Sequence, residues 1–289
     1  MEIRVRDTTL FFDVEGAKLV PDGAAMREKP TLLLLHGGPG FDHSSFKPGF
    51  SKLADVAQIV YLDHRGNGRS ARDSPERWNL ATWSDDVRAF CEALSIERPV
   101  VLGQSFGGMV AMSYATRHPE HPGKLILSST TARTRLDRVV ATFERLGGRE
   151  AADAARAYWD APGPETLPDY ARVCFPLYSR TPQDPDGNAR TVWNFDVMFH
   201  FGGGEDLAFD LLPDLGRVAC PTLVLAGEDD PITPIGDAED IAAALPSRCA
   251  RLVRFPGCGH GVFRDDPAAG YGAIRSFLTE GGAAASQAR

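Results

Sequence analysis

Ser105 is the residue whose surroundings most clearly indicate chemistry. It lies in residues 103–107, GQSFG, which fit the pattern GxSxG, between an apolar run over residues 99–102 and a predicted helix over residues 109–117. In this arrangement a tight strand-to-helix turn holds the serine hydroxyl above the end of a sheet. The flanking glycines let neighbouring backbones pass closely, because they carry no Cβ. The pattern therefore predicts that Ser105 is a nucleophile.

A nucleophilic serine needs a base to take its proton and an acid to orient that base. After a turn of this kind the acid comes next in the chain and the histidine last, on loops that follow later strands. Downstream of Ser105, His260 is the histidine in a glycine-flanked loop directly after a predicted strand, so it is the predicted base. The acid should follow the strand over residues 221–226, where spacing does not separate three carboxylates: Glu228, Asp229 and Asp230.

Acyl transfer also needs preorganised donors for the oxyanion of the tetrahedral intermediate, and backbone N–H groups suffice. One is expected from Phe106, the residue after the nucleophile, and the other from the loop HGGPG over residues 36–40. Gly38 is the predicted donor in that loop. His36 precedes Ser105 in the chain, so it is expected to shape the loop and not to act as the base.

The elements that must position these residues alternate between strands and helices, which predicts a mostly parallel sheet flanked by helices. A hairpin over residues 3–14 and a Pro-, Gly- and charge-rich segment over residues 18–30 come first. The predicted strands are 31–35, 57–62, 99–102, 124–127, 221–226 and 251–255, and the predicted helices are 44–54, 81–94, 109–117, 237–245 and 267–278.

The alternation stops over residues 131–212, where helical stretches are separated by proline- and glycine-rich segments. We expect this region to be a helical cap inserted between two parts of the core, residues 1–130 and 213–289. Helices are predicted over 138–146 and 151–159, and residues 201–206 are a lid hinge or a plain loop. A minority of the cap aromatics should line a pocket, and the rest should form the cap core: Trp159, Tyr170, Phe175, Tyr178, Trp193, Phe195, Phe199 and Phe201.

Composition excludes several classes of function. A chain of 289 residues with a formal net charge of −8 is not suited to bind nucleic acid or an anionic membrane, because both call for basic patches. The 5 cysteines lack paired CxxC spacing, so no disulfide framework, metal site or other cofactor is expected. Neither a signal-peptide core nor a membrane-spanning apolar run is present, which predicts a cytoplasmic protein whose partner is a small-molecule or short-peptide substrate.

Five collinear motifs carry a family resemblance: HGGPG (36–40), DHRGNGRS (63–70), GQSFGG (103–108), GEDDPITP (227–234) and GCGHGVF (257–263). On these residues the chain resembles α/β-hydrolases of the proline iminopeptidase-like group. The resemblance implies the α/β-hydrolase fold and places the catalytic acid three residues after the glycine, at Asp230. Asp63 and Arg65 are expected to hold a loop by hydrogen bonds and a salt bridge, not to touch substrate.

The resemblance implies a serine hydrolase that works through an acyl-enzyme on a small ester, lactone or amide, with removal of N-terminal proline as one activity in this range. The chain departs from the group at two places. Phe106 stands where the group usually has tryptophan. Pro231 stands where some members carry an acidic residue that holds the substrate amine.

Three cap residues are predicted to contact substrate, namely Trp193, Asp196 and Glu205, and Asp206 is a further acid that could take the missing role. Two alternatives stay open at this point. One is an esterase or lactonase without peptidase activity, and the other is a ligand receptor that keeps the fold without turnover.

Overall fold

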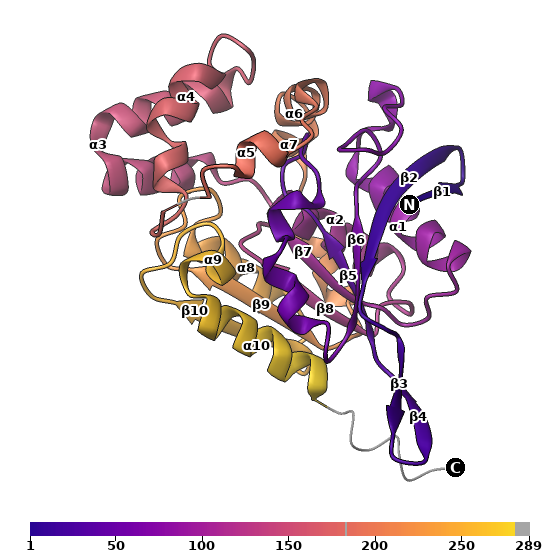
Figure 1. Ribbon diagram of the computed structural model, residues 1–289. Helices are drawn as coiled ribbons and strands as arrows, with labels where there is room; N and C mark the ends of the chain where they lie inside the picture. The colour runs from indigo at the N-terminus through magenta and orange to yellow at the C-terminus, as the bar shows by residue number, and fades with distance from the viewer. Residues whose placement is uncertain (183, 281–289) are drawn as a thin grey trace.

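The computed structural model describes residues 1–182 and 184–280; residue 183 and residues 281–289, the end of the predicted second core part, lie outside the described range. An eight-stranded sheet runs through the molecule in the order β1-β2-β6-β5-β7-β8-β9-β10 (Figure 1). Its strands are β1 (Glu2–Val5), β2 (Thr8–Glu15), β5 (Thr31–Leu35), β6 (Gln58–Leu62), β7 (Val100–Gln104), β8 (Lys124–Ser128), β9 (Thr222–Gly227) and β10 (Ala250–Phe255). The order confirms the predicted α/β-hydrolase architecture.

From β6 to β10 the sheet is parallel, and β1 and β2 form an antiparallel hairpin that joins it at β6. The parallel strands other than the edge strand β10 are buried almost throughout, which is why their sequences are largely apolar. Leu33 and Leu35 of β5 pack into the core on one face, and Leu32 and Leu34 pack into the core on the other.

Helices cover both faces of the sheet. One face carries α1 (Leu80–Ala93), α2 (Phe106–Arg117) and α8 (Ile235–Ala244), and the other carries α9 (Val262–Asp265) and α10 (Pro267–Thr279). Asn79 begins α1 by accepting a hydrogen bond from the backbone N–H of Thr82 at 2.8 Å. A short 3₁₀ turn, η3 (Pro75–Arg77), precedes α1.

Two segments of the first core part differ from the sequence-based prediction. Residues 44–54 are not one helix but two 3₁₀ turns, η1 (His43–Phe46) and η2 (Gly49–Leu53). The residue before a proline avoids helical geometry, and Lys47, which precedes Pro48, is extended. Residues 18–30 contain a separate hairpin, β3 (Leu19–Asp22) and β4 (Ala25–Glu28), which turns at Gly23, whose φ is 61°.

The chain between β8 and β9 forms a layer of helices over the carboxyl ends of the strands (Figure 1). We call residues 131–212 the cap segment. Its elements are α3 (Leu136–Asp160), α4 (Leu167–Val173), η4 (Phe175–Leu177), α5 (Gly187–Arg190), α6 (Phe195–Gly202) and α7 (Glu205–Ala208), and η5 (Leu212–Arg217) begins at its last residue. The two helices predicted over 138–146 and 151–159 are halves of α3, which is interrupted at Gly148, where φ is 72°.

The cap segment has an apolar core of its own. Phe143 of α3 packs with Tyr170 of α4, and Tyr158 stacks on Tyr170 with ring centroids 4.4 Å apart. Across residues 1–182 and 184–280, no helix combines the length and the apolar character needed to span a membrane.

Candidate active site

Ser105 occupies a strained turn between β7 and α2. Its φ of 54° and ψ of −123° are unfavourable for a residue with a side chain, and such strain persists only where the surroundings fix it. Here the Ser105 carbonyl accepts hydrogen bonds from Thr130 Oγ1 at 2.7 Å and from the N–H of Gly108 at 2.8 Å. A Cβ on Gly107 would run into the carbonyl oxygen of Leu35, so α2 can start this close to β5 only with glycine there. The turn is the one that the GxSxG pattern predicts.

His260 and Asp230 meet because β9 and β10 are parallel neighbours and the two residues follow their carboxyl ends. His260 Nδ1 lies 2.9 Å from Asp230 Oδ2 and 3.1 Å from Oδ1. Asp230 is completely buried, and it is fixed by the N–H of Ile232 at 2.9 Å and by the N–H and hydroxyl of Thr233 at 3.0 and 2.8 Å. With Nδ1 donating to the carboxylate, Nε2 of His260 is the nitrogen left to accept a proton.

The two neighbouring carboxylates are used elsewhere. Glu228 accepts a hydrogen bond from Arg254 at 3.0 Å, and Asp229 accepts one from Arg145 of α3 at 2.8 Å. The structure therefore brings Asp230, of the three candidates that spacing left open, to the histidine.

The loop after β5 is arranged by His36. Its Nε2 accepts the N–H of His64 at 3.2 Å, which leaves Nδ1 to donate to the carbonyl of Gly37 at 2.7 Å. Burial lowers the pKa of His36, which favours the neutral ring and this tautomer. In a trans peptide the C=O and N–H point in opposite directions, so the N–H of Gly38 points away from His36. Gly38 also lines the same cavity as Ser105.

Phe106, the second predicted oxyanion donor, is the first residue of α2, where backbone N–H groups have no partner within the helix. Its side chain is completely buried and points into the core, with its ring centroid 4.8 Å from that of Trp83 and 5.3 Å from that of Phe201. The Phe106 ring therefore serves packing, and its backbone is the part available to the site.

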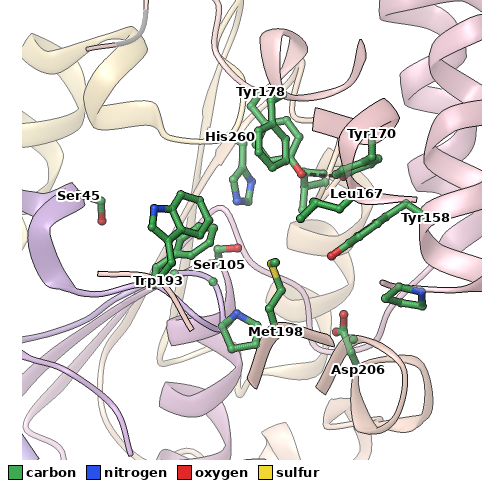
Figure 2. Close-up of a pocket in the computed structure, with 18 of the residues that line it drawn as sticks. Ser45, Ser105, Tyr158, Leu167, Tyr170, Tyr178, Trp193, Met198, Asp206 and His260 are labelled. Carbon is green, nitrogen blue, oxygen red and sulfur yellow. Dashed lines mark hydrogen bonds between the residues drawn. The ribbon is translucent and has the colours of Figure 1, made fainter. Parts of the chain in front are cut away.

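A cavity of about 220 Å³ lies between the sheet and the cap segment, and Ser105 and His260 both face it (Figure 2). Gly37 and Gly38 contribute backbone to the same wall as Ser105. Most of the remaining surface comes from apolar and aromatic side chains of the cap segment, among them Tyr158, Leu167, Tyr170, Tyr178, Trp193 and Met198. More of the predicted cap aromatics line the cavity than the expected minority, since Trp159, Tyr170, Phe175, Tyr178 and Trp193 all do so.

The three predicted substrate contacts in the cap segment have different outcomes. Trp193 lines the cavity, with its ring centroid 4.6 Å from that of Phe41. Asp196 is exposed on α6, and the carboxylate of Glu205 accepts a hydrogen bond from the N–H of Leu80 at 2.8 Å, at the start of α1. Neither Asp196 nor Glu205 is among the described residues that line the cavity. Their prediction as substrate contacts is therefore corrected.

Asp206 is the acid of the cap segment that enters the cavity. Its side chain is held by a 3.2 Å hydrogen bond from Thr134 Oγ1, and only 6% of the residue is exposed. Burial raises its pKa from 3.8 to about 7. Burial and, to a smaller extent, the charge of Asp206 raise the pKa of Tyr158 to about 12. Figure 2 shows the side chains of Tyr158 and Asp206 facing each other at one end of the cavity. Sequence reasoning missed Tyr158, because helical spacing did not show which face of α3 meets the cavity.

The residues of the DHRGNGRS motif play the structural part expected of them. Asp63 is buried and accepts hydrogen bonds from the N–H of His43 at 2.9 Å and from its Nδ1 at 2.7 Å. Arg65 is also buried and forms a two-point ion pair with Asp86 at 2.7 and 2.8 Å. Asn67 reaches the oxyanion loop, where its Oδ1 accepts the N–H of Gly40 at 2.6 Å. The motif therefore braces the loop that carries Gly38.

Comparison with known proteins places these features in a family. Residues 30–267 match the family model described as alpha/beta hydrolase fold. A proline iminopeptidase from Lactobacillus helveticus (strain DPC 4571) is 32% identical over 258 residues, which cover 82% of this chain and 85% of that protein. A putative carbamate hydrolase, RutD, from Caulobacter sp. (strain K31) is 28% identical over 279 residues and covers 92% and 97% of the two chains.

Solved structures share the fold. The crystal structure of a proline iminopeptidase from Mycobacterium smegmatis superposes with a TM-score of 0.73 at 24% identity and covers 97% of both chains. An esterase from Exiguobacterium antarcticum superposes with a TM-score of 0.71 at 19% identity and covers 96% of this chain and 99% of that one. The chain therefore belongs to the α/β-hydrolase family and, within it, to the proline iminopeptidase-like group. It is a hydrolase.

Proposed function

We propose that the protein is a serine hydrolase in which Ser105, His260 and Asp230 form a catalytic triad. Ser105 Oγ attacks the substrate carbonyl while His260 Nε2 takes its proton, and Asp230 orients the imidazole and stabilises its cationic form. The N–H groups of Gly38 and Phe106 hold the oxyanion. His260 then protonates the leaving group, and water, activated by the same imidazole, releases the acyl group from Ser105. The hydrogen bond between His260 and Asp230, with His260 and the strained Ser105 lining one cavity, supports this proposal.

The substrate we propose is a small acyl compound with a cationic amine, and N-terminal prolyl peptides are the first candidates. The supporting observation is Asp206, a buried carboxylate that faces the cavity. Among the described residues its side chain has one hydrogen bond, from the hydroxyl of Thr134. An ammonium group bound there would supply a counter-charge to this carboxylate. Asp206 would thus take the amine-binding role that the residue at position 231, a proline, does not provide.

A neutral ester or lactone is the second candidate. The aromatic walls supplied by Tyr158, Tyr170, Tyr178 and Trp193 favour it, because they suit an apolar acyl group whether or not the substrate also carries an amine. With a pKa of about 7, Asp206 is also largely protonated in slightly acidic solution and then tolerates a neutral substrate. The two candidates differ in whether the free amine contributes to binding.

A hydrolysis panel distinguishes them. We would compare L-prolyl p-nitroanilide, its N-acetylated form and p-nitrophenyl butyrate, with wild type and Asp206→Asn. If Asp206 binds the amine, Asp206→Asn raises KM for the free prolyl amide by about 10- to 100-fold, corresponding to a charged hydrogen bond of about 1.5–3 kcal/mol. KM for the butyrate ester should change far less. Hydrolysis of the butyrate ester by wild type, with no turnover of either amide, would instead support the esterase assignment.

A further inference from the structure

His260 is held by the cap segment as well as by the sheet. Its backbone N–H donates to the carbonyl of Tyr178 at 2.6 Å, and the two rings lie edge to face with centroids 5.7 Å apart (Figure 2). A Cβ on Gly259 would collide with the same carbonyl oxygen, so the loop of His260 and the cap segment at Tyr178 are in direct contact. The proposed base is therefore attached on one side to Asp230 of the core and on the other to residue 178 of the cap segment.

Asp265, the last residue of α9, also connects the cap segment to the loop of His260. From the cap segment it accepts the hydroxyl of Ser179 at 2.6 Å, the N–H of Arg180 at 3.0 Å, and the N–H and hydroxyl of Thr181 at 3.1 and 2.8 Å. From the histidine loop it accepts the N–H of Gly259 at 2.7 Å. One carboxylate thus connects three consecutive cap residues to the residue before His260.

The environment of Asp265 suits an ionised carboxylate. Burial opposes ionisation, but the hydrogen bonds from Ser179, Gly259, Arg180 and Thr181 outweigh it and lower the pKa of the group. An ionised carboxylate accepts at both oxygens, and charge-assisted hydrogen bonds are stronger than neutral ones. The three cap residues supply their donors to Oδ1, while Gly259 donates to Oδ2, which also receives the N–H of Arg180 at 3.1 Å.

We propose that Asp265 is a positioning residue for the hydrolytic reaction: it ties residues 178–181 of the cap segment to the backbone of His260, so that seating of the cap segment sets the imidazole for proton transfer. This rests on the proposed role of His260. The link continues to the substrate cavity, because Tyr178 Oη lies 2.6 Å from Tyr170 Oη and both tyrosines line it. A substrate that packs against these tyrosines therefore also steadies the chain that holds the base.

Asp265→Asn tests the proposal. The amide nitrogen cannot accept a hydrogen bond, so the variant must lose either the bond from the backbone N–H of Gly259 to Oδ2 or the bond from the backbone N–H of Thr181 to Oδ1. We expect kcat for the best substrate of the panel to fall by about 10- to 100-fold, as for other small misplacements of catalytic groups. KM should stay within about threefold, and labelling of Ser105 by a small fluorophosphonate should slow in step with kcat. A merely structural loosening of the cap would raise KM and leave labelling by this small probe unchanged.

Asp266→Asn is the matched control. Asp266 is the neighbouring carboxylate, and it caps α10 by accepting the N–H of Ala269 at 3.0 Å, a role that asparagine also fills. This control should keep the wild-type kcat. Folded Asp265→Asn with kcat and labelling rate within about twofold of wild type would overturn the proposal.

A second variant covers the case in which Asp265→Asn does not fold. Ser179→Ala combined with Thr181→Val removes both hydroxyl donors on the cap side and leaves Gly259 in place. It should lower kcat in the same direction by a smaller factor, and an unchanged kcat would also overturn the proposal. A wrong triad assignment would be recognised separately, because Ser105→Ala would then keep the activity of the wild type.

Discussion

Replacing Asp206 by asparagine is expected to stabilise the protein, and more so as the pH rises. In the unfolded chain the carboxyl group has its ordinary pKa of 3.8, whereas burial raises it to about 7 in the folded protein. Between these values the folded state retains a proton that the unfolded state has lost, so stability falls with increasing pH. At about 1.4 kcal/mol for each pH unit, the full cost above pH 7 is about 4 kcal/mol as an upper limit.

Asparagine has nearly the same shape and keeps an oxygen for the hydroxyl of Thr134, but it carries no charge to desolvate. The free energy of unfolding of Asp206→Asn should therefore exceed that of wild type by up to about 4 kcal/mol at pH 8 and by less than about half of that at pH 5. Urea denaturation at pH 5, 6, 7 and 8 and constant ionic strength measures both proteins. The same variant should bind amine substrates less well, as expected for a destabilising group retained for function.

Asp196→Asn is the control, since Asp196 is an exposed acid of the same cap segment. Its difference from wild type should stay within about 0.5 kcal/mol at every pH. The reasoning would be refuted if the stability gain of Asp206→Asn did not grow between pH 5 and pH 8. That result would mean that water reaches the carboxylate and keeps its pKa near the ordinary value.

The remaining predictions concern the triad and the turn that carries it. Ser105→Ala should lower kcat by about 10⁶-fold and abolish fluorophosphonate labelling. Asp230→Asn should lower kcat by about 10⁴-fold, and both values of kcat are measured with the best substrate of the panel. Labelling of the Ser105→Ala variant would contradict the assignment of Ser105 as the nucleophile. Gly107→Ala should destabilise the protein by about 1–3 kcal/mol or more in urea denaturation, because its Cβ would collide with a carbonyl oxygen of β5. An unchanged midpoint would show that α2 can move away from the sheet.

Much of the fold follows from the sequence because its signals are local. The apolar run over residues 31–35 became β5 with those bounds, and the glycines around Ser105 indicated the turn between β7 and α2. The error at residues 44–54 was also local, since Pro48 carries the signal that breaks the helix. The hairpin of β3 and β4 went unpredicted, because its side chains are mostly exposed and show no hydrophobic alternation.

The sequence by itself determined which loops could hold the site, because the loops after parallel strands gather at one edge of the sheet. Ser105, His260 and the loop of Gly38 all follow such strands. Spacing alone did not separate Asp230 from its two neighbours; the family resemblance pointed to Asp230, and the tertiary structure brings it to His260. The tertiary structure also distinguished Asp206 from Glu205, its neighbour on α7, because successive helical residues point about 100° apart and packing decides which of them is buried. The composition of a loop is encoded locally, whereas the direction and burial of each carboxylate depend on the elements packed around it.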